Sequence, residues 1–167
     1  LNEDWGLDHG TWSVVRPMFP DASIPVIQLS LDYTKDTQYH YDLAKQLAGL
    51  RKKGVLIIGS GNMVHNFQFA RFTGDFNAHF GHDWALEANE VFKKLISEND
   101  VKSLVNYKTY SKALQLSSPT PDHYLPMIFL KPRLFLRQNE CPREFRNKVH
   151  KGLDLPFPRN YLFCFLE

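Results

Sequence analysis

The sequence contains only two cysteines, Cys141 and Cys164, among its 167 residues. They show no metal-ligand spacing, and although one disulfide between them is conceivable, they are typical of free thiols in a cytoplasmic chain. No apolar run approaches the roughly 20 residues that a membrane span needs, so we expect no membrane segment. The chain also begins without a charged and then apolar signal pattern, so we expect no secretion.

Neither sign of charge is in large excess, because 20 Lys and Arg stand against 18 Asp and Glu and the formal net charge is only +2. Residues 131–167 hold eight Lys and Arg against four Asp and Glu, whereas residues 1–130 hold twelve against fourteen. A net charge of −2 on the body argues against a basic nucleic-acid face, so we expect no nucleic-acid partner. The 43% hydrophobic content is ordinary for a globular protein, and the length fits one domain or part of one.

Two short apolar runs predict buried strands. They cover residues 24–31, with Pro25 at a tolerated first position, and residues 54–58. Between them, apolar residues at helical spacing predict a helix that begins near residues 34–36 and ends at Lys52. Strand, helix and strand form a βαβ unit with parallel strands. Further helical segments are expected at 12–18, at 84–99 after a cap at Asp83, and at 101–107, and a loop is expected at 117–121. The sequence therefore predicts an α/β fold with a mostly parallel central sheet flanked by helices.

A glycine loop follows the second strand at Gly59-Ser60-Gly61. A dinucleotide fingerprint would need a third glycine where Val64 stands, so this pattern gives little support to a nucleotide-binding protein. The glycines more plausibly allow a sharp turn that brings Asn62, His65 and Asn66 to one site at the carboxyl end of the strand.

Seven histidines are present. Four of them, His40, His79, His82 and His150, are expected to be structural or exposed. The other three, His9, His65 and His123, each lie in a loop beside an expected strand or helix, where function tends to collect. Three such imidazoles could bind a divalent transition metal or move protons near neutral pH.

At these residues the chain resembles a known family. The segments GLDHGTW (6–12), MFPDASIPVIQLSLD (18–32), YHYDLAKQLAGLRKKGVLIIGSGNMVHN (39–66) and SPTPDHYLP (118–126) are similar to DODA-type extradiol dioxygenases, relatives of the catalytic subunit of protocatechuate 4,5-dioxygenase. The resemblance implies the class III extradiol dioxygenase fold, of which residues 1–130 would be the C-terminal portion of a single catalytic domain. It also implies ring opening of a catechol such as DOPA by O2 at one Fe(II) or Zn(II) ion.

The resemblance assigns roles residue by residue. His65 matches a histidine that acts either as acid–base catalyst or as metal ligand, and His123 matches a metal ligand with Asp122 beside it. His9 matches a histidine that positions the catechol or its oxygen, and Asn62 lies on the substrate side. Two further ligand histidines of the family belong to N-terminal motifs resembling GHGSP and SAHW, which this chain lacks. The fold is therefore expected to be incomplete, and the chain alone to bind metal poorly.

Two other interpretations stay open. A non-enzymatic binding protein could use the same scaffold, as a resemblance to the Memo family allows. The sequence pattern changes abruptly at residues 131–167, which are either an adapted terminal segment or an artefact of the gene model. The preferred catechol, the metal and the oligomeric state do not follow from the sequence.

Overall fold

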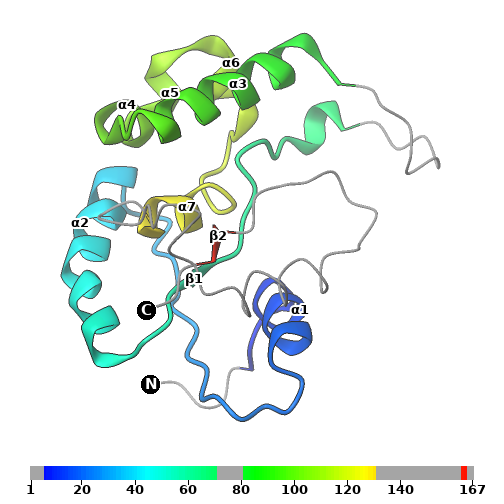
Figure 1. Cartoon of the computed structure of the whole chain (residues 1–167). Coiled ribbons are helices and arrows are strands. Elements are labelled where there is room, and N and C mark those ends of the chain that lie inside the picture. The colour runs from blue at the N-terminus through cyan, green and yellow to red at the C-terminus, as the bar shows by residue number, and fades with distance from the viewer. Residues whose placement is uncertain (1–5, 71–80, 131–162, 165–167) are drawn as a thin grey trace.

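The computed structural model of the chain describes residues 6–70, 81–130 and 163–164. Figure 1 shows α3 to α6 grouped at one end, with α2 and α7 next to each other beyond them. The helices are α1 His9–Met18, α2 Thr37–Leu47, α3 Asp83–Ser97, α4 Val101–Val105, α5 Tyr107–Tyr110, α6 Lys112–Ser117 and α7 Leu125–Leu130. Two 3-10 helices, η1 Ala48–Lys53 and η2 Phe67–Phe69, and two strands, β1 Ile58–Gly59 and β2 Phe163–Cys164, complete the described elements.

Helix α2 confirms the helix expected between the two apolar runs. It begins after Asp36, whose side chain accepts a hydrogen bond from the backbone N–H of Tyr39 at 2.8 Å and so caps the free amides of the first turn. The buried side chains are His40 and Ala44, whereas Tyr39 is exposed. Helix α7 packs against α2, and the ring of Phe129 meets His40 edge to face at 5.8 Å. This contact selects the face that is buried.

Helix α3 and its neighbours supply the core. The helix expected at 84–99 is confirmed, although Asp83, expected as its cap, is its first residue. Ala88, Phe92, Leu95 and Ile96 form the buried face, with Trp84 and Val91 packed at the margin. The rest of the core comes from the segments that follow and from the loop after β1: Met63, Leu104, Tyr107, Ala113, Leu114, Tyr124, Met127 and Ile128. Burial of this apolar surface holds α3, α6 and α7 together.

Two buried tyrosines fasten the segment between α6 and α7. The rings of Tyr107 and Tyr124 lie 4.0 Å apart between centroids. Tyr107 Oη donates to the carbonyl of Ser118 at 3.0 Å, and Tyr124 Oη donates to the carbonyl of Leu104 at 2.7 Å. Burial raises the pKa of Tyr107 to about 12 and that of Tyr124 well above its ordinary value of 10.0, so both hydroxyls remain donors.

The strands differ from the expectation. Residues 24–31 are extended but form no strand, and Ile27 within them is 76% exposed. Within the described ranges no segment pairs with them, and a strand exists only through such pairing. Of the run at 54–58 only Ile58 belongs to a strand, and β1 pairs with β2 antiparallel rather than parallel to 24–31. The expected βαβ unit is therefore absent from the described residues.

Several residues singled out in the sequence cannot be placed in the fold. His79, His150, Cys141 and most of the tail at 131–167 lie outside the described residues. The short helix expected at 101–107 is two helices, α4 and α5, and the helix expected at 12–18 begins earlier, at His9. None of the described helices has both the length and the apolarity to cross a membrane.

Candidate functional site

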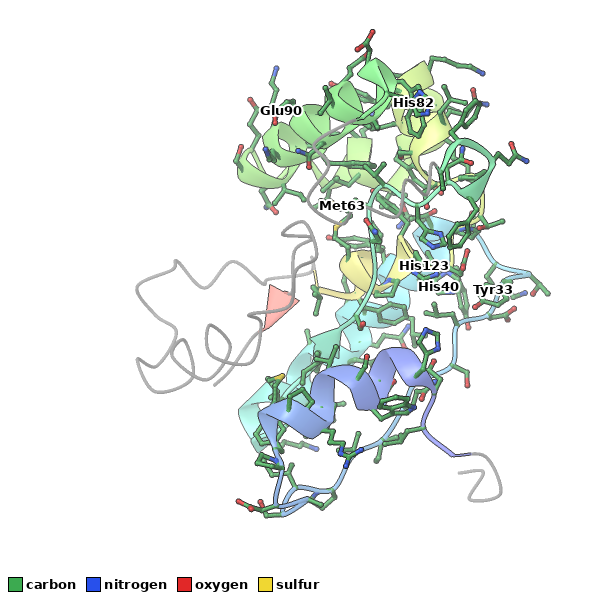
Figure 2. All side chains as sticks on the ribbon, turned by 90° about the vertical axis from the view of Figure 1, so that its right-hand side faces the viewer. Tyr33, His40, Met63, His82, Glu90 and His123 are labelled. Carbon is green, nitrogen blue, oxygen red and sulfur yellow. The ribbon has the colours of Figure 1, made fainter. Side chains whose placement is uncertain are left out.

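The structure brings His65 and His123 into direct contact. Their rings stack with centroids 3.6 Å apart and planes inclined by 24°. His65 lies in the loop between β1 and η2, and His123 lies 58 residues later, just before α7. Figure 2 shows Glu90, on α3, and His82, just before α3, at the top of the view, with His123 lower down towards the middle of the molecule. Two of the three loop histidines singled out in the sequence therefore share one site.

Hydrogen bonds to the backbone hold the two loops together. Asn62 N–H donates to the carbonyl of His123 at 2.8 Å, and His65 N–H donates to the carbonyl of Ser117 at 2.7 Å. Asn66 Nδ2 adds a bond to the carbonyl of Leu116 at 2.7 Å. These three bonds set the position of His65 relative to His123 without using either imidazole, so both rings stay available for chemistry.

The glycine loop serves this approach of the two backbones. A Cβ atom at Gly61 would lie 2.3 Å from the carbonyl oxygen of His123, and one at Gly59 would lie 2.7 Å from that of Pro126. A Cβ atom cannot approach a backbone oxygen this closely, so glycine is required at both positions. The loop therefore provides clearance for the His123 segment, in agreement with its interpretation as a turn rather than a phosphate cradle.

A carboxylate completes the cluster. Asp122 Oδ2 lies 3.5 Å from His123 Nε2, and no described residue hydrogen-bonds to the buried Oδ1. Burial by itself would raise the pKa of Asp122, but a hydrogen bond from Thr120, the residue's own backbone and the two imidazoles outweigh it and hold the pKa below 3.8. Asp122 is therefore ionised at neutral pH.

The imidazole of His65 is biased toward its neutral form. Partial burial lowers its pKa below the ordinary 6.5, and the neighbouring His123 lowers it further, while Asp122 acts in the opposite direction. A neutral imidazole can accept a proton or donate a lone pair to a metal. The structure thus supports either of the two roles open to His65.

The other two predicted site residues take different places. His9 is the exposed first residue of α1, after the cap Asp8, and within the described residues no hydrogen bond or ring contact joins it to His65 or His123. The start of α1 nevertheless adjoins the glycine loop, because a Cβ atom at Gly10 would lie 4.0 Å from Ser60 Oγ. Asn62 is half-buried, and its Oδ1 accepts from Val64 N–H at 3.1 Å, so the side chain shapes the turn that leads to His65.

The side chains of His65, His123 and Asp122 are of the types that bind a divalent metal, but they are not placed together as a complete ligand set. Two neutral imidazoles and a carboxylate are ligands that Fe(II) and Zn(II) accept. The lone pairs of an imidazole lie in the ring plane, and the two rings here are stacked face to face. In the part of the chain that the structure describes, no three His, Cys, Asp or Glu side chains are placed to hold an ion. His65, His123 and Asp122 therefore form at most a portion of a metal site.

One residue at the site was missed in the sequence. Phe67 places its ring 4.5 Å from that of His65 between centroids, at an interplanar angle of 77°, and it is 70% exposed. The available signal was its position two residues after the candidate histidine in an aromatic-rich loop.

Comparison with known proteins identifies the family of this chain. Residues 1–123 match the family described as the catalytic LigB subunit of aromatic ring-opening dioxygenase. The match covers most of the chain and includes His9, Asn62, His65 and His123, so the chain belongs to this family. The resemblance found in the motifs is confirmed, and membership implies the class III extradiol dioxygenase fold.

Individual relatives carry a common name. The chain is 40% identical over 131 residues to the 4,5-DOPA dioxygenase extradiol of Escherichia coli, which covers 77% of this chain and 47% of the relative. Proteins of the same name from Portulaca grandiflora and Beta vulgaris are each 34% identical, over 76% and 73% of this chain and 46% and 44% of their own lengths. The chain thus spans about half the length of the curated relatives it matches.

Proposed function

We propose that this chain contributes to an extradiol dioxygenase that opens the ring of a catechol such as DOPA with O2. The observation that carries the proposal is the stacked pair His65 and His123, which lies within the family match and is held by backbone hydrogen bonds. The relatives named 4,5-DOPA dioxygenase extradiol support DOPA as the first substrate to test. The partners are a small-molecule catechol and O2, and the proposed location is the cytoplasm.

The roles of the site residues follow from their environment. His123 is proposed as a metal ligand, and His65 as a second ligand or as the base that takes a proton from a catechol hydroxyl. The lowered pKa of His65 suits both roles, because the neutral ring has a free lone pair at pH 7. His9 and Asn62 are proposed on the substrate side of the glycine loop. A bound Fe(II) or Zn(II) would supply positive charge that holds the catechol oxygens and O2 side by side.

The remaining ligands are proposed to come from sequence that this chain does not contain. The described residues offer fewer than three placed donors, and the relatives are about twice as long as the matched region. The mostly parallel central sheet is likewise a proposal for the whole domain, in which residues 1–130 form the C-terminal portion. We expect the chain alone to bind metal poorly and to turn over little.

Oxygen uptake tests the proposed function. The chain would be compared with a chimera that carries the N-terminal part of the Escherichia coli relative ahead of it, using DOPA and protocatechuate under Fe(II). Uptake is expected in the chimera only, and His65→Ala should abolish it. His82→Gln is the matched control, because His82 contacts Phe69 and Trp84 rather than the candidate pair.

Two outcomes would contradict the proposal in different ways. If the chain alone took up oxygen as fast as its full-length relatives, the described donors would be sufficient for metal binding and ring opening. No uptake in either protein, with both folded by circular dichroism, would favour a binding protein on the same scaffold.

A further inference from the structure

Phe67 lies on the outer side of the candidate histidine pair. The ring of His65 is stacked on His123 and also meets Phe67 edge to face, with 4.5 Å between centroids. Because Phe67 is 70% exposed, one part of its ring contacts His65 while the rest faces open space. The three rings thus form an aromatic cluster with a free apolar surface directly beside the imidazole that carries the proposed chemistry.

The exposure of Phe67 does not come from a loose chain. Asn66 Oδ1 accepts from Gln68 N–H at 3.0 Å and caps the short helix η2, while Asn66 Nδ2 ties that cap to Leu116. On the other side, Phe69 packs against His82 and Trp84, and the His82 Nε2 atom lies 3.0 Å from the Phe69 carbonyl oxygen. The turn is therefore held by contacts at both ends, and it presents Phe67 outward.

An exposed phenylalanine of this kind fits a planar aromatic ligand. Aromatic rings gain from offset or edge-to-face contact beyond the area that they bury, and a ring fixed in advance loses little freedom on binding. We propose that Phe67 forms the aromatic wall of the substrate site, against which the ring of the catechol packs beside His65. The inference rests on the proposed function and adds a substrate-binding residue that selects aromatic over non-aromatic ligands.

Three substitutions at Phe67 separate aromatic contact from simple apolar contact. Phe67→Leu keeps an apolar side chain without a ring, Phe67→Ala removes the side chain, and Phe67→Tyr keeps the ring. Tyr110→Leu is the matched control, because Tyr110 is an exposed aromatic side chain on another element and has no ring contact with His65 or Phe67 among the described residues. Each variant would be made in the chimera described above, loaded with Fe(II) without oxygen, and titrated with 4-nitrocatechol by absorbance.

The expected result is a dissociation constant raised on the order of tenfold in Phe67→Leu and Phe67→Ala. Phe67→Tyr and Tyr110→Leu should bind as the parent protein does. In oxygen uptake the same two loss variants should raise KM for DOPA and leave kcat within about twofold, because the contact is made equally in the ground state and the transition state.

Two results would overturn the inference, and they can be told apart. If the parent protein binds 4-nitrocatechol and Phe67→Leu binds equally well, Phe67 is no part of the substrate site and the proposed function stands. If the folded parent protein fails to bind 4-nitrocatechol at all, the proposed function fails and the inference fails with it.

Discussion

Gly61 shows how a single residue governs the site. The clearance that it leaves for the carbonyl oxygen of His123 also allows the bond from Asn62 N–H to that oxygen, so the absence of a side chain and the hydrogen bond act together. The sequence indicated a sharp turn here, but the atom that must be cleared lies 62 residues further along the chain. Such a partner cannot be inferred from local pattern.

Replacing Gly61 tests this clearance. Gly61→Ala would place a Cβ atom against backbone that cannot swing aside, so we expect a loss of about 1–3 kcal/mol in the free energy of unfolding and displacement of the His123 imidazole. Urea denaturation and the NMR signals of the imidazoles measure the two effects. Gly49→Ala is the control, because no atom lies within 4 Å of a Cβ atom there. Equal stability of both variants would contradict the argument.

His65 makes stability depend on pH. Burial and His123 hold its folded-state pKa below 6.5, so the unfolded chain binds a proton more readily than the folded chain. The contribution of His65 to stability is therefore complete well above pH 6.5. It is lost as the pH falls from about 6.5 through the lower folded-state pKa.

Urea denaturation between pH 8 and pH 5 measures this dependence. We expect the free energy of unfolding to fall over this range and to fall less steeply in His65→Gln. The exposed His9 supplies the control variant His9→Gln, which should keep the slope of the parent chain. An unchanged slope in His65→Gln would show that another group titrates.

At the scale of elements, α2 and α3 followed from local information, whereas α6, α7 and the strands did not. The cap at Asp36 and the apolar spacing along 83–97 are contained within each segment, so α2 and α3 were predictable. Which face of α2 is buried depends on α7, more than 70 residues later, so the burial of His40 and the exposure of Tyr39 could not be inferred from the segment itself. Residues 24–31 have strand composition, but strand formation requires a partner that no local pattern supplies.

The segment between α6 and α7 depends on Tyr124. Its hydroxyl is buried and donates to the carbonyl of Leu104 at 2.7 Å, which fastens the residue after His123 to α4. Tyr124→Phe leaves that carbonyl without its partner, so we expect a loss of about 1–2 kcal/mol in the free energy of unfolding. Thermal and urea denaturation measure it. Tyr110→Phe, at an exposed position, should change stability little, and equal effects of both changes would refute the role of this bond.

At the scale of the whole molecule, residues 24–29 present apolar side chains to solvent. Ile24, Val26, Ile27 and Leu29 are all exposed, on a segment that is extended and unpaired among the described residues. The family was recognisable from the order of its motifs, and one of those motifs contains this segment. The exposure of this segment, however, depends on how the whole chain folds and could be seen only in the structure.

A charge in this segment should reduce self-association. Ile27→Lys removes the most exposed apolar side chain of the segment, so we expect weaker concentration-dependent light scattering and weaker binding of a hydrophobic dye. Leu86→Lys is the control, because Leu86 is 60% exposed on the helix α3, where the backbone is already paired. Equal decreases in both variants would point to net charge rather than to the segment.

The same segment has a consequence for the protein inside a cell. An extended, uncharged and apolar stretch that is not covered is a substrate for quality control, since chaperones and proteases act continuously on chains that expose such surface. Covering residues 24–29 would remove that signal without altering His65 or His123. Exposure of this stretch is therefore expected to shorten the lifetime of the chain in a cell, independently of its chemistry.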